Sequence, residues 1–234
     1  MTPVKLDLKD NSIRFLYLFL VTDLAFIVIH LVYVHADVLS NPSFSLDQER
    51  GYSEIFQYIK EYWIALLLGA LAVKQRSALY LGWSLLFFYL LLDDSLTIHE
   101  ILGAIISEKL DLQAVFNLRA LDFGELIVSA GVGLFFLFFL AIAYRFASRI
   151  PRETSKSLII MFLVLAVFGI AVDMLHSMLR FSLFWEPLLA MLEDGGEMVV
   201  MSVIAWFVYK RSESLYPNVK SLEQQEKTLE TQYR

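Results

Sequence analysis

The chain has 234 residues, of which 58% are hydrophobic, and it carries a formal net charge of −6. Soluble domains are about 45–50% apolar, and the excess here lies in long blocks, which indicates a membrane protein rather than a large soluble domain. The negative charge gives no reason to expect a nucleic-acid partner. The absence of cysteine excludes disulfides, thiolate nucleophiles and cysteine-ligated metal clusters.

Apolar blocks of about 20 residues, the length that crosses a bilayer, follow one another along the chain. They predict an all-α fold, a polytopic bundle of six transmembrane helices. The first block is longer than the roughly 7–15 apolar residues of a signal peptide, so we expect it to be the first span. The predicted spans are residues 12–35, 54–73, 78–106, 119–146, 157–184 and 187–209.

The remaining segments define the predicted organisation around this bundle. A polar N-terminal segment, residues 1–11, precedes the transmembrane domain, residues 12–209, and a charged tail, residues 210–234, follows it. The basic segment 147–156 contains Pro151 and is expected to be a link between spans. Gly131 and Gly133 in the fourth span are expected to let that helix pack closely against a neighbour.

Lysine and arginine are distributed unequally between the two sides of the predicted bundle. Most of those that flank the spans fall on the side of the N-terminus. The positive-inside rule therefore places both termini in the cytoplasm. The opposite, outer side carries the smaller set of Arg50, Lys60, Lys109, Arg119 and Arg180.

Acidic residues and histidines interrupt the apolar spans at one predicted depth. At about 1.5 Å of rise per residue, those of the third, fourth, fifth and sixth spans all fall in the outer half of the bundle. Spacings of three, four or seven residues place the members of each span on one helix face. Ionisable groups are expensive in hydrocarbon and usually mark function, so we expect these side chains to converge in the bundle interior.

A bound metal ion is the preferred prediction for this cluster, because so many carboxylates cannot all stay ionised and unpaired in a low dielectric. Bound protons or a water-filled vestibule are the alternatives. Carboxylate and imidazole ligands without sulfur suit Zn, Fe or Mn, with Ca as a further option. The predicted ligands are Asp93, His99, Glu100, Asp122, Glu125, Asp173, His176, Glu193 and Glu197, and the predicted charge or hydrogen-bond partners are Asp23, His30, Asp94, Arg180 and Asp194.

Two acidic boxes carry a resemblance to known sequences. DDSLTIHE at residues 93–100 and LEDGGEM at residues 192–198 resemble boxes of uncharacterised bacterial multi-pass membrane proteins. This resemblance implies a bacterial inner-membrane location and a site shared by both boxes, but no activity. Asp173 and His176 are similar to the Glu-x-x-His pairs of di-iron carboxylate bundles, with aspartate in place of glutamate. The late His-x-x-x-His pair of membrane zinc hydrolases of the ceramidase type does not occur in the sequence.

Three functions fit such a site. The first is a metal-dependent hydrolase or oxidoreductase that acts on a lipid or another membrane-associated substrate, with a carboxylate as general base. The second is a transporter or channel for a divalent cation or protons, against which the apolar inner half of the bundle argues. The third is a sensor or assembly protein with a structural cation site, whose tail binds a cytoplasmic partner. A homo-oligomer is compatible with each.

Overall fold

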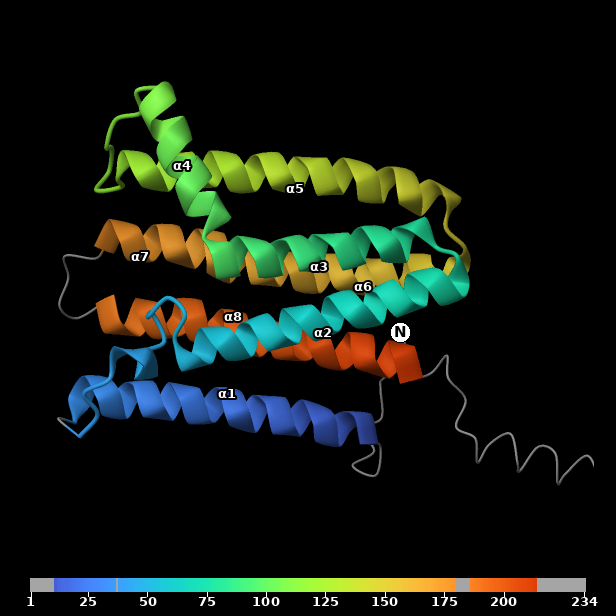
Figure 1. Ribbon diagram of the computed structural model, residues 1–234, viewed down its shortest axis with the longest axis horizontal. Coiled ribbons are helices and arrows are strands. Elements are labelled where there is room, and N and C mark those ends of the chain that lie inside the picture. Colours follow the sequence, from blue (N-terminus) through green and yellow to red (C-terminus); the bar gives the residue numbers. More distant parts are fainter. Residues whose placement is uncertain (1–10, 37, 180–185, 214–234) are drawn as a thin grey trace, which may run out of the picture.

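The computed structural model describes residues 11–36, 38–179 and 186–213, and this part of the chain is an all-α bundle. Its long helices lie side by side along one axis, and α2 packs between α3 and α8 while α1 packs against α8 (Figure 1). A short 3₁₀ turn, Pro42–Phe44, lies between α1 and α2. The long helices are α1 (Asn11–His35), α2 (Tyr52–Gln75), α3 (Ala78–Leu96), α5 (Ala120–Phe146), α6 (Arg149–Ala166) and α8 (Glu186–Glu213).

Five helices of the described chain are long and apolar enough to cross a bilayer, which supports a multi-pass membrane protein. They are residues 12–35, 52–75, 78–96, 120–146 and 149–179. Their outward faces are apolar as well: Leu134, Phe135 and Phe138 on α5 are each more than 60% exposed. Such exposed apolar surfaces are suited to contact with the acyl chains of a lipid bilayer.

The predicted third span, residues 78–106, is wrong as a single helix. Thr97 adopts the left-handed conformation, with φ 50° and ψ 43°, and ends α3 at Leu96. A second helix, α4 (Ile98–Lys109), then turns away from the bundle axis and crosses α5 (Figure 1). The break has a local cause, because the carboxylate of Asp93 accepts the backbone N–H of His99 at 2.8 Å and so caps the new helix.

The predicted link at residues 147–156 is also wrong, because α6 already begins at Arg149. Pro151 lies in its first turn, where the missing N–H would have no intrahelical partner. The rod continues through a π-helical segment, η2 (Val167–Val172), into α7 (Asp173–Leu179). The predicted end of this span at residue 184 lies outside the described residues.

Glycine permits close packing of the fourth predicted span, but at another position than expected. A Cβ atom added to Gly124 would lie 2.1 Å from the carbonyl oxygen of Gly103, so α4 and α5 touch backbone to backbone at this crossing. Gly131 and Gly133 have no heavy atom within 4 Å of such a Cβ, and the expectation of close packing there is wrong.

Large side chains from α2, α3, α6 and α8 fill the core. Trp83, Tyr80 and Phe87 of α3 are almost fully buried, together with Leu158 of α6 and Met201 of α8. The polar atoms of the aromatic residues are paired, since Tyr80 Oη lies 3.0 Å from Thr154 Oγ1 and Trp83 Nε1 donates to Ser155 Oγ at 2.8 Å. This core aligns the helices on which the ionisable groups lie.

Candidate metal site

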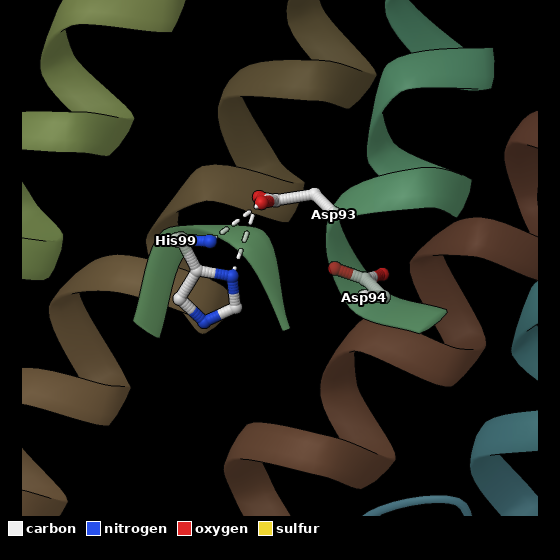
Figure 2. A group of neighbouring side chains, drawn as sticks. All are labelled: Asp93, Asp94 and His99. Carbon is white, nitrogen blue, oxygen red and sulfur yellow. Dashed lines mark hydrogen bonds and ion pairs between the residues drawn. The ribbon is translucent and has the colours of Figure 1, made fainter. Parts of the chain in front are cut away.

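The break between α3 and α4 brings three potential ligands together. Asp93 and Asp94 lie in the last turn of α3, and His99 lies in the first turn of α4 (Figure 2). One ligand atom from each of these side chains lies within 4.8 Å of the other two. Within the described part of the chain, this is the group of acidic and histidine side chains whose spacing suits one metal ion.

Asp93 holds the imidazole of His99 in place. Nδ1 of His99 lies 3.3 Å from Oδ2 of Asp93, while Oδ1 of Asp93 accepts the backbone N–H of the same histidine. Tyr89 Oη also donates to Oδ1 of Asp93, at 3.4 Å. The hydrogen bond to Asp93 raises the pKa of His99 to about 9, so the ring is a cation at neutral pH when no metal competes for it.

Two further predicted ligands surround His99. Glu100 follows it on α4, and burial together with the nearby carboxylate of Glu49 raises the pKa of Glu100. Glu125 on α5 interacts electrostatically with His99, and its backbone nitrogen lies against Gly103 of α4 at the helix crossing. The close contact between the helices therefore sets the position of Glu125 relative to the histidine.

The remaining predicted ligands form neighbouring pairs at the same end of the bundle. Oδ1 of Asp122 lies 2.6 Å from the guanidinium of Arg119. His176 Nδ1 lies 2.6 Å from Oε2 of Glu193, and Glu193 interacts with Asp173 and Asp194. These contacts involve predicted site residues, but Asp122 pairs with Arg119 while His176 pairs with Glu193. Arg180 lies outside the described residues.

His30 lies apart from these pairs. Its Nδ1 accepts the backbone N–H of Leu46 at 3.1 Å and lies 3.1 Å from Ser45 Oγ. The ring thereby fastens the segment between α1 and α2 to α1. A structural role explains this histidine without a metal.

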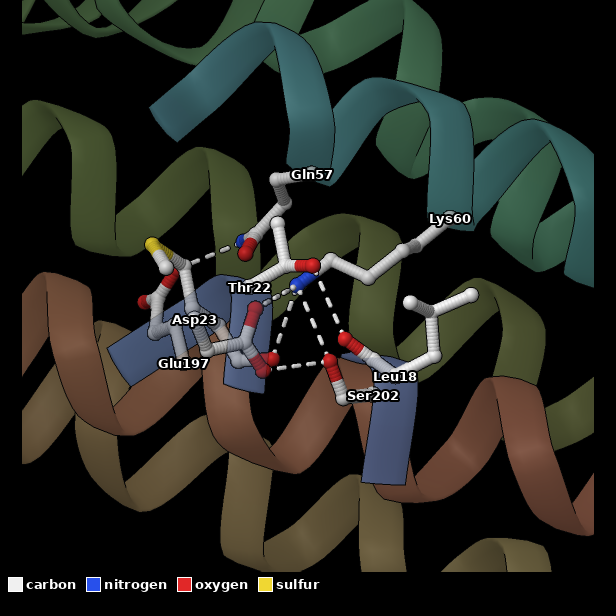
Figure 3. A network of polar contacts seen from close by, with 8 residues as sticks. Leu18, Thr22, Asp23, Gln57, Lys60, Glu197 and Ser202 are labelled. Carbon is white, nitrogen blue, oxygen red and sulfur yellow. Dashed lines mark hydrogen bonds and ion pairs between the residues drawn. The ribbon is translucent and has the colours of Figure 1, made fainter. Parts of the chain in front are cut away.

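Asp23 belongs to a buried network around Lys60, one of the basic residues counted above on the outer side of the membrane. Both side chains are 0% exposed inside the bundle, and Lys60 Nζ lies 3.1 Å from Oδ1 of Asp23 (Figure 3). Lys60 also donates to the carbonyl oxygen of Met198 at 2.9 Å and to Ser202 Oγ at 3.2 Å. Ser202 in turn donates to Oδ2 of Asp23 at 2.5 Å, so α1, α2 and α8 are joined at this point.

Glu61 and Gln57 are further interior groups, and neither is among the predicted ligands or charge partners. Glu61 is 1% exposed and Gln57 is 8% exposed. Gln57 Nε2 donates to Oε2 of Glu197 at 3.3 Å. The spacing of Gln57, Lys60 and Glu61 by three and four residues puts them on one face of α2, and this spacing is the signal that could have found them.

Glu197 lies against the π-helical segment at Gly169. A Cβ at Gly169 would lie 2.2 Å from Oε1 of Glu197, so a larger residue there would displace this carboxylate from its position beside η2. Short π-helical segments are uncommon and are frequent at functional sites. The irregular backbone and the carboxylate of α8 are therefore fitted to each other.

A family model described as a domain of unknown function, DUF8692, matches residues 15–212 of the chain. No curated protein matches the sequence. No solved structure matches it either.

Proposed function

The chain belongs to the DUF8692 family, a domain of unknown function, and from its geometry we propose that it is a multi-pass membrane protein that binds a divalent metal ion through Asp93, Asp94 and His99. The observation that carries this proposal is the spacing of the three ligand atoms, within 4.8 Å of one another at a helix break. Ligands of one zinc-type ion lie roughly 3–4 Å apart, given bonds of about 2.0–2.2 Å. Small side-chain movements therefore suffice to close the site.

The backbone at the break supports a functional role for it. Thr97 has a positive φ of 50°, and for a β-branched residue this conformation costs on the order of 1–3 kcal/mol. Such strain persists only where the surrounding structure imposes it. Here it turns α4 so that His99 faces the carboxylates of α3.

Two carboxylates and one imidazole without sulfur suit Zn²⁺, Mn²⁺ or Fe²⁺. Three protein ligands leave a coordination position for water, as a catalytic metal requires. Glu100 and Glu125, which interact electrostatically with His99, supply candidate general bases. The chemistry proposed is therefore metal-dependent hydrolysis or oxidation.

A lipid or another membrane-associated molecule is the proposed substrate class. Beside the site, α4 exposes Ile101, Leu102 and Ile105, and these side chains form an apolar surface next to the metal ligands. A substrate with acyl chains can lie against such a surface while its polar part reaches the ion. A screen that compares lipids with soluble esters as substrates would test this substrate class.

Metal analysis of the purified full-length protein tests the proposal directly. After dialysis against low micromolar Zn²⁺ or Mn²⁺, the wild type should retain one more ion per chain than the variant that combines Asp93→Asn with His99→Ala. Asp111→Asn, at an exposed position, is the matched control and should bind as the wild type does. Equal metal content in the wild type and the double variant would refute the site.

Cation or proton translocation is the second candidate, and the Lys60 network favours it. Buried ionisable groups inside a membrane bundle commonly mark ion and proton pathways, and Asp23 and Lys60 extend the polar interior beyond the metal ligands. Proteoliposomes would distinguish the two functions. Uptake of Mn²⁺ or protons that disappears in Glu197→Gln would favour translocation, and its absence in the wild type would favour the enzyme.

The topology is part of the same proposal. We propose that α8 is a sixth span, since it packs along α1, α2 and α6 over its length, and its 28 residues extend about 42 Å at 1.5 Å each. Glu193, Asp194 and Glu197 interrupt its apolar run and lie toward partners inside the bundle. Both termini would then be cytoplasmic, in a bacterial inner membrane, with residues 210–234 available to a partner.

A further inference from the structure

Buried oxygen atoms without hydrogen-bond donors gather beside the proposed metal site. Both carboxylate oxygens of Glu61 and the amide oxygen of Gln57 are buried, and among the described residues none has a hydrogen-bond partner of ordinary geometry. Leaving such an acceptor unpaired costs about 1–3 kcal/mol, and more for a charged group. Three of these atoms on two consecutive turns of α2 indicate that something outside the described chain satisfies them.

Lys60, the neighbouring cation, cannot donate to Glu61. An ammonium group has three N–H bonds, and those of Lys60 are directed to Asp23 Oδ1, the carbonyl oxygen of Met198 and Ser202 Oγ. Its positive charge favours the ionised form of Glu61, but its three N–H bonds are already used by other acceptors. Lys60 therefore leaves both carboxylate oxygens of Glu61 without a donor.

The other groups near Glu61 add negative charge. Its strongest electrostatic neighbours are the carboxyls of Asp94 and Glu197, and both repel Glu61 when all three groups are ionised. The carboxyls of Glu61 and Asp94 are close enough to share a hydrogen bond when one of them carries a proton, so a proton is the alternative to a bound cation. Gln57 Nε2 donates a hydrogen bond to Glu197, and the absence of a side chain at Gly169 leaves room for the other carboxylate oxygen. Gln57, Glu61, Asp94 and Glu197 are thus neighbours between α2, α3 and α8. The three carboxyls lie farther apart than the ligand atoms of the first site, so a bound ion would have to draw them together.

We propose that Gln57, Glu61, Asp94 and Glu197 form a second cation site, which takes a hard divalent ion of the Ca²⁺ or Mn²⁺ type. Its donors are oxygen atoms alone, the set that such ions prefer. The first site differs by its imidazole, which favours Zn²⁺ or Fe²⁺ as well as Mn²⁺. The inference shares only Asp94 with the proposed function, so the two sites are adjacent and their occupancies are coupled.

Mn²⁺ is the probe for the test, because both donor sets accept it. The full-length protein is purified in detergent, stripped with a chelator and dialysed against Mn²⁺, and the bound metal per chain is counted. The wild type should bind two ions, and Glu61→Gln and His99→Ala should bind one each. Glu108→Gln, an exposed glutamate on α4, is the matched control and should bind two.

The outcomes separate the two sites. One ion in the wild type that is lost in His99→Ala and kept in Glu61→Gln overturns the second site and retains the first. One ion with the opposite pattern retains the second site and overturns the first. No bound Mn²⁺ in the wild type overturns both and leaves protons as the neutralising cations.

Stability provides an independent readout that does not depend on counting ions. In chelator, Glu61→Gln should melt at the same temperature as the wild type or higher, because it removes a buried negative charge. In Ca²⁺ the order should reverse, since only the wild type gains from the ion. If Glu61→Gln does not fold, Gln57→Met removes the amide oxygen together with the Nε2 donor to Glu197, keeps the carboxylate of Glu61, and should weaken Ca²⁺ binding at least tenfold. Unchanged Ca²⁺ binding in whichever of these variants folds would contradict the inference.

Discussion

The ion pair between Asp23 and Lys60 shows how single residues are used in this bundle. Both side chains are fully buried, and every hydrogen-bonding atom of the ammonium has an acceptor. A buried pair contributes little net stability compared with apolar residues, but removing one partner strands the other charge. The pair therefore fixes how α1, α2 and α8 are rotated relative to one another.

Lys60→Met should destabilise the protein by about 3–5 kcal/mol, because Asp23 is left as an uncompensated buried charge. Adding Asp23→Asn to this variant should recover part of the loss, since the stranded charge is removed. Thermal or denaturant unfolding in detergent measures both effects. The exposed Lys109→Met change should alter stability by less than about 0.5 kcal/mol, and an equal loss there would argue against the specific pair.

The pH dependence of the metal-free protein should report the contact between His99 and Asp93. The pKa of His99 is raised from 6.5 to about 9, chiefly by the hydrogen bond to Asp93, so its folded state binds the proton more tightly than the unfolded chain does. This stabilisation is complete below about pH 6.5 and is lost as the pH rises through about 9. In chelator, the stability difference between the wild type and His99→Gln should therefore shrink between these values. A difference that grows with pH would contradict the assignment.

At the scale of the helices, the break at Thr97 and the glycine crossing position the site together. The break directs α4 across α5, and the contact between Gly103 and Gly124 sets how closely the two helices approach. Without the first feature His99 would continue along the axis of α3, away from Asp93. Without the second, Glu125 would lie farther from His99.

Gly124→Ala should push α4 away from α5, because the added Cβ would meet a backbone oxygen that cannot move independently of its helix. We expect a loss of about 1–3 kcal/mol in stability and weaker metal retention at His99. Gly131→Ala, where the new methyl group meets nothing within 4 Å, is the control on the same helix and should be neutral or slightly stabilising. Equal effects of the two changes would show that the crossing is not tightly packed.

At the scale of the whole molecule, the bundle exposes large apolar side chains along its helices and buries a set of charged groups within. The carboxyls and histidines gather toward the end where α4 lies, whereas Tyr80, Trp83, Thr154 and Ser155 pair near the other end. Polar side chains therefore also pair inside the bundle at the end away from α4. A membrane protein arranged in this way presents one polar region to one side of the bilayer.

Cysteine labelling tests the proposed orientation, and the chain suits it because the natural sequence contains no cysteine. Gln113→Cys and Ser148→Cys place single thiols at exposed positions beyond the two ends of α5. An impermeant maleimide added to intact cells should label Gln113→Cys only from outside, and Ser148→Cys only after permeabilisation. The reverse pattern would invert the topology, and labelling of both positions in intact cells would exclude α5 as a span.

The sequence alone determined the class of the protein and the approximate limits of most helices. The predicted spans 12–35, 54–73 and 119–146 agree with α1, α2 and α5 within two residues at each end. The physical reason is local: in lipid a segment satisfies its own backbone hydrogen bonds only as a helix, and its length must match the hydrocarbon thickness. The acidic boxes were also visible, because ionisable residues stand out within apolar runs.

Only the tertiary structure decided which of these groups meet. From the sequence, Lys60 contributed only to the count of basic residues on the outer side, whereas α1 and α8 pack around it in the structure. Glu61 and Gln57 were not among the predicted site residues, because they belong to a polar first half of α2. The break at Thr97 depends on the carboxylate of Asp93, which accepts the backbone N–H of His99 across the break. Helix rotation, crossing and side-chain reach are properties of the packed bundle, so residue spacing within one helix predicts a shared face but not the partner across it.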